Sequence, residues 1–262
     1  MFKIDDIIVD RILEGYAEDF SGNLLYILTQ LQDAKINIGA ESKDAKDKDG
    51  TLIKKFWKGK SGTFEATNAM LNLNILAASS GSAKEVASDS NKITMPKTIK
   101  VKSGQTVTLK DFVAGSVVVV GQDTNGTMGK SYAQAATASD TEFGITSAGV
   151  LTPPTDTDVA YFKVKYKRTV SSGVAIRNKA DKFPGTVKLT LKALCVDPCS
   201  ADTLRACYIE LPSFQVSPET EISLGSDSTT LAYKGDLQVD YCSEDKALYN
   251  IYMAEDDEED NE

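Results

Sequence analysis

Alternation of apolar and polar residues restricts the fold of this chain more than any other feature. In the run 159–167 (VAYFKVKYK), Phe162, Val164 and Tyr166 fall on one side of an extended chain, and three lysines fall on the other. Successive side chains of a β-strand point to opposite faces, so this run predicts a half-buried strand. Shorter runs of strand character, separated by turn residues, recur along most of the chain. The sequence therefore predicts a mainly β fold.

One segment has a helical period instead. Residues 68–81 place apolar side chains three and four positions apart. Thr67 or Asn68 can cap the start of a helix, and Gly81 suits its end. We expect one short helix that flanks the strands.

The residues before this helix predict a β-hairpin. Two runs of strand character, at 51–58 and 62–67, are joined by a short link at 59–62 (GKSG). A charged turn is expected at 43–50, and a further strand at 34–38.

The strands fall into two sets. A small, polar stretch at 82–93 is typical of a linker, and short strands separated by turns follow it. We predict that residues 94–170 form an inserted small β-sandwich module. Strands of the first kind resume after it, so residues 1–93 and 171–254 are expected to form one discontinuous β-sandwich or barrel domain.

The net charge of −9 is concentrated at one end of the chain. Residues 255–262 hold seven acidic residues, which leaves 31 acidic and 29 basic residues elsewhere. Like charges in a run repel one another, so we expect an acidic, disordered tail. The four lysines of 54–60 are spread along a predicted strand and do not form a nucleic-acid-binding cluster. We therefore expect no sequence-specific binding of DNA or RNA.

Histidine is absent from the chain. This excludes Ser/His/Asp and Cys/His catalytic arrangements, which need an imidazole to move protons near neutral pH. It also excludes metal sites built on two histidines. We expect no enzymatic activity and no cofactor.

Two stretches imitate ligand-binding motifs and fail in detail. The run 126–131 (GTMGKS) ends like a phosphate-binding loop, but Thr124 stands where that motif needs its first glycine. The run 45–56 resembles a calcium loop, but Ala45 and Phe56 occupy the first and twelfth ligand positions. A glycine-rich loop and an acidic turn are the expected structures.

Four cysteines, Cys195, Cys199, Cys207 and Cys242, lack the doubled close pairs of common zinc sites. We expect free thiols; disulfides in a mature particle and a thiolate metal site are the alternatives.

No apolar run approaches the roughly 18 to 20 residues that cross a bilayer, and the first residues carry acids where a signal peptide carries bases. We expect synthesis in a cytosol, where thiols stay reduced, and no membrane partner.

Four stretches together resemble the major tail tube proteins of long-tailed bacteriophages: 49–81 (DGTLIKKFWKGKSGTFEATNAMLNLNILAASSG), 181–198 (DKFPGTVKLTLKALCVDP), 205–241 (RACYIELPSFQVSPETEISLGSDSTTLAYKGDLQVDY) and 247–253 (ALYNIYM). The first is similar to the family's charged turn, hairpin and flanking helix. The others are similar to strands that cross a barrel and return.

The resemblance implies a tail-tube-like domain and a virion structural protein of the tail. Six copies would close into a ring, and stacked rings would surround a channel for DNA. The implied partners are further copies of the chain, other tail proteins and DNA in transient, non-specific passage. A sheet with exposed edges is satisfied by pairing with another subunit, which agrees with assembly.

The expected site residues lie on and beside the predicted hairpin. Phe56, Trp57 and Phe64 are candidate interface anchors, with an ordinary core role as the alternative. Asp44, Asp47, Asp49 and Glu65 are candidate channel-facing residues, because a wall that repels phosphate lets DNA pass; a solvated surface role is the alternative. The 94–170 module is expected on the outside of the ring.

Other functions fit the same sequence. Another virion β protein, such as a head-decoration or baseplate component, is the first. A carbohydrate-binding or adhesin-like β-sandwich is the second, supported by Trp57 and ten tyrosines. An enzyme that works without histidine is the third.

Overall fold

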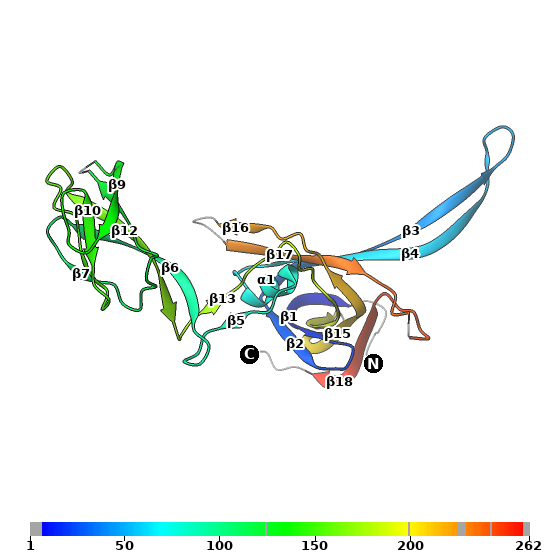
Figure 1. The fold of residues 1–262 in the computed structure, drawn as a ribbon. Helices are drawn as coiled ribbons and strands as arrows, with labels where there is room; N and C mark the ends of the chain where they lie inside the picture. Colours follow the sequence, from blue (N-terminus) through cyan, green and yellow to red (C-terminus); the bar gives the residue numbers. More distant parts are fainter. Residues whose placement is uncertain (1–6, 124, 199, 225–228, 242, 259–262) are drawn as a thin grey trace. The chain divides into compact units, whose positions relative to one another are not determined.

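The computed structural model describes residues 7–258 apart from residues 124, 199, 225–228 and 242 (Figure 1). Strands account for 58% of the residues and helix for 3%, which confirms the predicted mainly β fold with one short helix. The chain divides into two units. Unit 1 comprises residues 1–84 and 176–262, and unit 2 comprises residues 85–175.

Unit 1 contains a nine-stranded sheet that forms a nearly closed barrel. The order along the sheet is β2-β1-β14-β15-β17-β4-β3, with β16 beside β17 and β18 beside β15. Paired strands are antiparallel. The strands are β1 (Ile8–Glu18), β2 (Leu24–Thr29), β3 (Leu31–Lys46), β4 (Leu52–Asn68), β14 (Thr186–Asp197), β15 (Ser200–Val216), β16 (Ile222–Leu224), β17 (Thr229–Leu237) and β18 (Asn250–Glu258).

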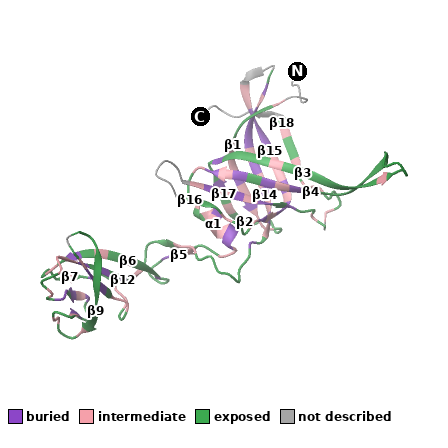
Figure 2. Ribbon diagram, turned by 90° about the horizontal axis from the view of Figure 1, so that it is seen from above, coloured by how far each residue is buried: buried purple, intermediate pink, exposed green. Residues whose placement is uncertain are grey.

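The core of unit 1 lies inside the barrel, where the buried residues gather (Figure 2). The rings of Phe64, Phe214 and Tyr233 meet there, with centroids 5.6 to 6.3 Å apart. The hydroxyls of Tyr26 and Tyr233 share a hydrogen bond of 2.9 Å, which connects β2 to β17. Burial raises the pKa of Tyr26 to about 12 and that of Tyr233 well above its ordinary value. Both phenols therefore stay neutral and act as fixed parts of the core.

The helix, α1 (Leu73–Ser80), is shorter than predicted. Asn68 belongs to β4, and its side-chain amide donates to the backbone oxygen of Thr29 at 2.6 Å. Asn72 caps the helix instead, because its Oδ1 accepts from the backbone N–H groups of residues 74 and 75. Gly81 ends the helix as predicted, with a φ of 60° that favours glycine.

The predicted hairpin within residues 51–67 is wrong, because residues 52–68 form one continuous strand, β4. Gly62 lies in this strand for a packing reason. A Cβ at this position would meet Ile38 Cδ1 at 2.5 Å and Leu237 Cδ1 at 3.0 Å. The chain turns earlier, within the predicted charged turn at 43–50, and β4 pairs with β3 across that turn.

The acidic run that was expected to be disordered from residue 255 begins inside a strand. The backbone of β18 pairs with β15 as far as Glu258, whose partner in register is Arg205. Strand pairing satisfies backbone N–H and C=O groups whatever charge the side chains carry. Residues 259–262 lie outside the described residues.

Unit 2 contains a seven-stranded sheet in the order β6-β12-β8-β9-β10-β11-β7. Its core contains Phe162, Val164 and Tyr166, as the alternation in 159–167 predicts. The short strands β5 and β13 pair Val86 with Val174, close to where the chain enters and leaves the unit. The elements are β5 (Glu85–Val86), β6 (Ile93–Lys102), β7 (Val107–Thr108), β8 (Val118–Gln122), β9 (Met128–Ala135), β10 (Glu142–Ile145), β11 (Val150–Thr152), β12 (Tyr161–Val170) and β13 (Val174–Ala175).

Candidate assembly surface

The most exposed apolar element of unit 1 is the ribbon formed by β3 and β4. An Asx turn closes it: Asp47 Oδ1 accepts from the backbone N–H of Asp49 at 2.9 Å and of Thr51 at 2.8 Å. Gly50 follows with a φ of 86°. The stretch that imitates a calcium loop is therefore the tip of a long hairpin.

The ribbon has two parts that differ in their neighbours. From Gly62 to Asn68, β4 pairs with β17 as well as with β3. Beyond Gly62, β3 and β4 pair with each other alone. We call residues 39–61 the distal arm; all of them are exposed except the half-buried Ala45.

The three predicted interface anchors fall on both sides of this division. Phe64 is fully buried in the barrel core and is not available to a partner. Phe56 and Trp57 lie on the distal arm, 52% and 67% exposed. The structure therefore separates one core residue from two candidate interface residues.

Apolar side chains occupy both faces of the distal arm, because successive strand residues point to opposite sides. Leu52 and Ile53 are 50% and 68% exposed and repeat the arrangement of the two aromatic residues. Sequence reasoning missed this pair. The signal was present in LIKKFWK, where apolar residues stand side by side without alternation, which is typical of a strand covered on both faces.

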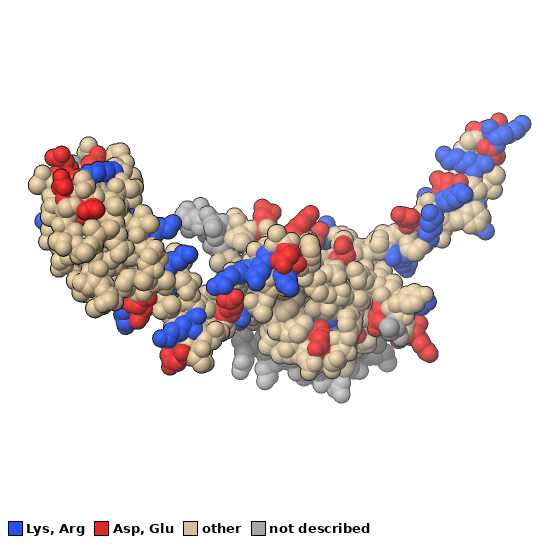
Figure 3. Space-filling model, in the orientation of Figure 1, with Lys and Arg blue, Asp and Glu red and all other residues tan. Residues whose placement is uncertain are grey.

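Lysines accompany the aromatic rings of the arm. Lys54 Nζ lies 5.2 Å from the ring centroid of Phe56, and Lys55 Nζ lies 5.4 Å from that of Trp57. Seven lysines and four carboxylates are interspersed along the distal arm (Figure 3). The arm thus combines exposed apolar area with a net positive charge.

The four predicted channel-facing carboxylates do not form one group. Asp47 and Asp49 lie at the tip of the arm. Asp44 lies near the tip on β3, 3.8 Å from Lys55. Glu65 lies at the base of the ribbon, exposed and in register with Lys35 and Lys234.

A polar pocket of about 580 Å³ opens on another part of unit 1. Burial alone would raise the pKa of Glu210 in this pocket, but hydrogen bonds from Lys188 and Asn250 hold it below its usual range. This carboxyl is therefore ionised at neutral pH. The charged side chains of the lining are five carboxylates and one lysine: Glu18, Asp19, Glu210, Asp240, Asp245 and Lys188.

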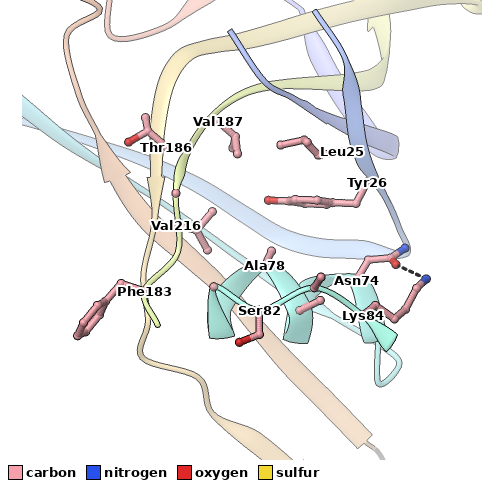
Figure 4. A pocket seen from close by; sticks show the side chains of 14 residues that line it. Leu25, Tyr26, Asn74, Ala78, Ser82, Lys84, Phe183, Thr186, Val187 and Val216 are labelled. Atoms are coloured by element: carbon pink, nitrogen blue, oxygen red, sulfur yellow. Dashed lines mark hydrogen bonds between the residues drawn. The ribbon is translucent and has the colours of Figure 1, made fainter. Parts of the chain in front are cut away.

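A second pocket of about 520 Å³ lies between β2, α1 and residues 183–187 (Figure 4). Its walls are mostly apolar and include Leu25, Ala78 and Val216. Lys84 Nζ donates to Asn74 Oδ1 at 2.9 Å at one side. Nothing in this lining pairs a nucleophile with a base, and the pocket suits an apolar side chain.

The cysteines that the structure describes are the buried, free thiols Cys195 and Cys207 on β14 and β15. A hydrogen bond between them raises the pKa of Cys195 and lowers that of Cys207. Cys199 and Cys242 lie outside the described residues. For those two, a free thiol, a disulfide and a thiolate metal site all stay predictions.

The other motif-like stretch also has a structural role. Gly126 precedes β9 and Gly129 lies within it, so this stretch becomes strand where a phosphate loop would start a helix. Nowhere in the described ranges do three or more acidic or thiol side chains gather as metal ligands would. At eight residues, α1 is far too short to span a bilayer, and it is the only helix of the described part.

A comparison with protein families matches residues 9–250 to the model of the YomU/Tube protein family. No curated protein matches the chain. The matched range includes all of unit 2, most of unit 1 and the whole β3–β4 ribbon. Since this match covers well over half of the sequence, the chain belongs to the YomU/Tube protein family, a phage-derived family of tube-type proteins.

Proposed function

We propose that the chain is the structural subunit of a phage tail tube. Six copies close into a ring, and stacked rings surround a channel for DNA passage. The observation that carries this proposal is the distal arm, which exposes four large apolar side chains on both faces of a ribbon. Within the described residues, β3 and β4 have no third strand beside them in this part.

The exposed apolar area favours a partner on energetic grounds. Fully burying a side chain such as Ile53 or Phe56 contributes about 1.5–3 kcal/mol. An exposed apolar ribbon with open edges is also a hazard for uncontrolled aggregation. A dedicated contact with another copy resolves both problems.

Charge supports a head-to-tail contact between copies. The distal arm carries seven lysines and four carboxylates, whereas the pocket around Glu210 carries five carboxylates and one lysine. We propose that the arm of one copy docks near this pocket of the next. Such a contact joins two different surfaces, so repetition closes a ring or continues as a tube.

Unit 2 is proposed to lie outside the channel. The β5–β13 pairing joins its first and last residues, so its removal leaves ends that a short linker can bridge. We expect that deleting residues 85–175 preserves ring formation. Soluble protein without rings would instead give unit 2 a structural role in the ring.

The proposal places the protein in the virion tail after synthesis in a host cytoplasm. Its partners are then other copies of the chain, further tail proteins and DNA in transit. The acidic tip residues Asp47 and Asp49 are candidates for the channel wall in this arrangement.

The experiment is negative-stain electron microscopy of the purified full-length chain over a concentration series. Six-fold rings or hollow tubes support the proposal. Isolated monomers or trimers at every concentration contradict it and favour another virion β protein, such as a head-decoration or baseplate component.

A further inference from the structure

Strand pairing in unit 2 brings together lysines that are far apart in the sequence. Lys163, Lys165 and Lys167 are exposed on one face of β12. The neighbouring strand β6 places Lys100 opposite Lys163 and Lys102 opposite Tyr161, on the same face. We call these five residues the lysine face.

No acidic residue interrupts the lysine face. The strands β6, β12, β8 and β9 contain no Asp or Glu, and the carboxylates of unit 2 lie in other segments. Among the residues that the structure describes, none of the five lysines is in an ion pair. By contrast, Lys130 of the same unit lies 3.9 Å from Asp156.

Folding of unit 2 does not explain this clustering. The core residues Phe162 and Val164 lie on the opposite face of β12, so the lysine side chains do not contribute to the core. Lys100 and Lys163 stand directly opposite each other, and like charges in that position destabilise a sheet. A feature that opposes folding and creates a strong local positive potential indicates an anionic partner.

We propose that the lysine face binds the phosphate backbone of duplex DNA without reading its bases. Alternate residues on β12 repeat about every 6.8 Å, so the charges form a row that suits an extended polyanion more than a single small anion. Lysines act as point charges that tolerate varied phosphate geometry. The proposal rests on strand register and charge in unit 2 and does not depend on the proposed tube.

The surroundings of the lysine face disfavour other nucleic-acid modes. Single strands are held mainly by stacking of bases on free aromatic rings. The ring of Tyr161 is covered by Lys100, whose Nζ lies 4.0 Å from the ring centroid. The face is a sheet surface and offers no helix to enter a major groove.

The register between β6 and β12 brings together a basic cluster in unit 2, whereas the sequence indicated only the spread lysines of residues 54–60. It also has a consequence for the proposed tube. Each lysine–phosphate contact must be broken again if DNA is to move, so a gripping surface is unsuited to a channel wall. The lysine face then belongs away from the channel.

The test is fluorescence anisotropy of a short labelled duplex of mixed sequence, titrated with the full-length chain at several salt concentrations. Five phosphate contacts predict a slope of log K against log salt of up to about −4.5. The variant K163Q/K165Q/K167Q should weaken binding at least tenfold at low salt and reduce the slope to about −1.8. The control K92Q/K110Q/K179Q makes the same change of net charge at exposed lysines off the sheet and should bind as the unaltered protein does.

Four results would overturn the proposal: no binding at low salt, binding that ignores salt, equal losses in the two triple variants, or tighter binding of a single strand than of the duplex. A melting curve by circular dichroism accompanies each variant. Because all six lysines substituted in the two triple variants are exposed, we expect both variants to melt as the unaltered protein does.

Discussion

The base and the distal arm of the β3–β4 ribbon are built from the same two strands, yet they differ in almost every physical respect. At the base, β17 pairs with β4 and the barrel core covers one face, so Phe64 is fully buried. In the distal arm β17 has ended, and Phe56, eight residues earlier on the same strand, is half exposed. The presence of a third strand therefore decides whether an aromatic residue serves the fold or is left for a partner.

The largest expected effect of this comparison is on stability. Phe64→Ala should lower the free energy of unfolding by about 3–5 kcal/mol, because it removes a ring that contacts Phe214 and Tyr233 in the core. Urea denaturation followed by far-ultraviolet circular dichroism measures the change. Phe56→Ala is the matched control and should stay within about 0.5 kcal/mol of the unaltered monomer. Equal losses for the two variants would remove the distinction between base and arm.

Two glycines of β4 give the next largest contrast. Gly62→Ala should cost about 1–3 kcal/mol, because the added methyl group meets Ile38 and Leu237. Gly59 has open space around its Cβ position, so Gly59→Ala should change stability by less than about 0.5 kcal/mol. The same denaturation curves report both variants. A costly Gly59→Ala would show that the arm is packed against something within the subunit.

The turn at the tip offers a smaller, local effect. Asp47→Ala removes the acceptor of two backbone hydrogen bonds and should destabilise the tip by about 1–2 kcal/mol. Hydrogen exchange read by mass spectrometry should show faster exchange in residues 39–61, with the barrel strands unchanged. Faster exchange throughout unit 1 would mean that arm and barrel unfold together.

The smallest effect is expected at the exposed ion pair of the arm. Asp44→Asn removes the carboxylate 3.8 Å from Lys55 Nζ and should change the stability of the monomer by less than about 0.5 kcal/mol. The denaturation midpoint checks this. A loss above 1 kcal/mol would indicate that the pair is shielded from water, contrary to the exposure of the arm.

The sequence predicted the fold where local periodicity alone decides it. The alternation of Phe162, Val164 and Tyr166, the helix end at Gly81 and the mainly β class are all confirmed. The prediction of a turn failed at Gly62, because a glycine that marks a turn and a glycine that permits close packing are identical in the sequence. The distinction depends on Leu237, which is 175 residues further along the chain.

The candidate site was predictable only in part for a related reason. Phe56 and Trp57 could be identified from residue type, but whether Phe64 joins them depends on where β17 stops. The lysine face of unit 2 depends on the register between β6 and β12, which no short stretch of sequence contains. Long-range pairing, more than residue type, positions both surfaces.

The central claim is that the distal arm joins copies of the chain, and sedimentation velocity tests it most directly. The variant F56A/W57A is compared with Phe183→Ala, which removes an aromatic side chain of unit 1 that is 72% exposed and lies off both the arm and the polar pocket around Glu210. At concentrations where the unaltered chain forms rings, we expect F56A/W57A to sediment as a folded monomer and Phe183→Ala to assemble as before. Rings of unchanged size and yield from F56A/W57A would contradict the account.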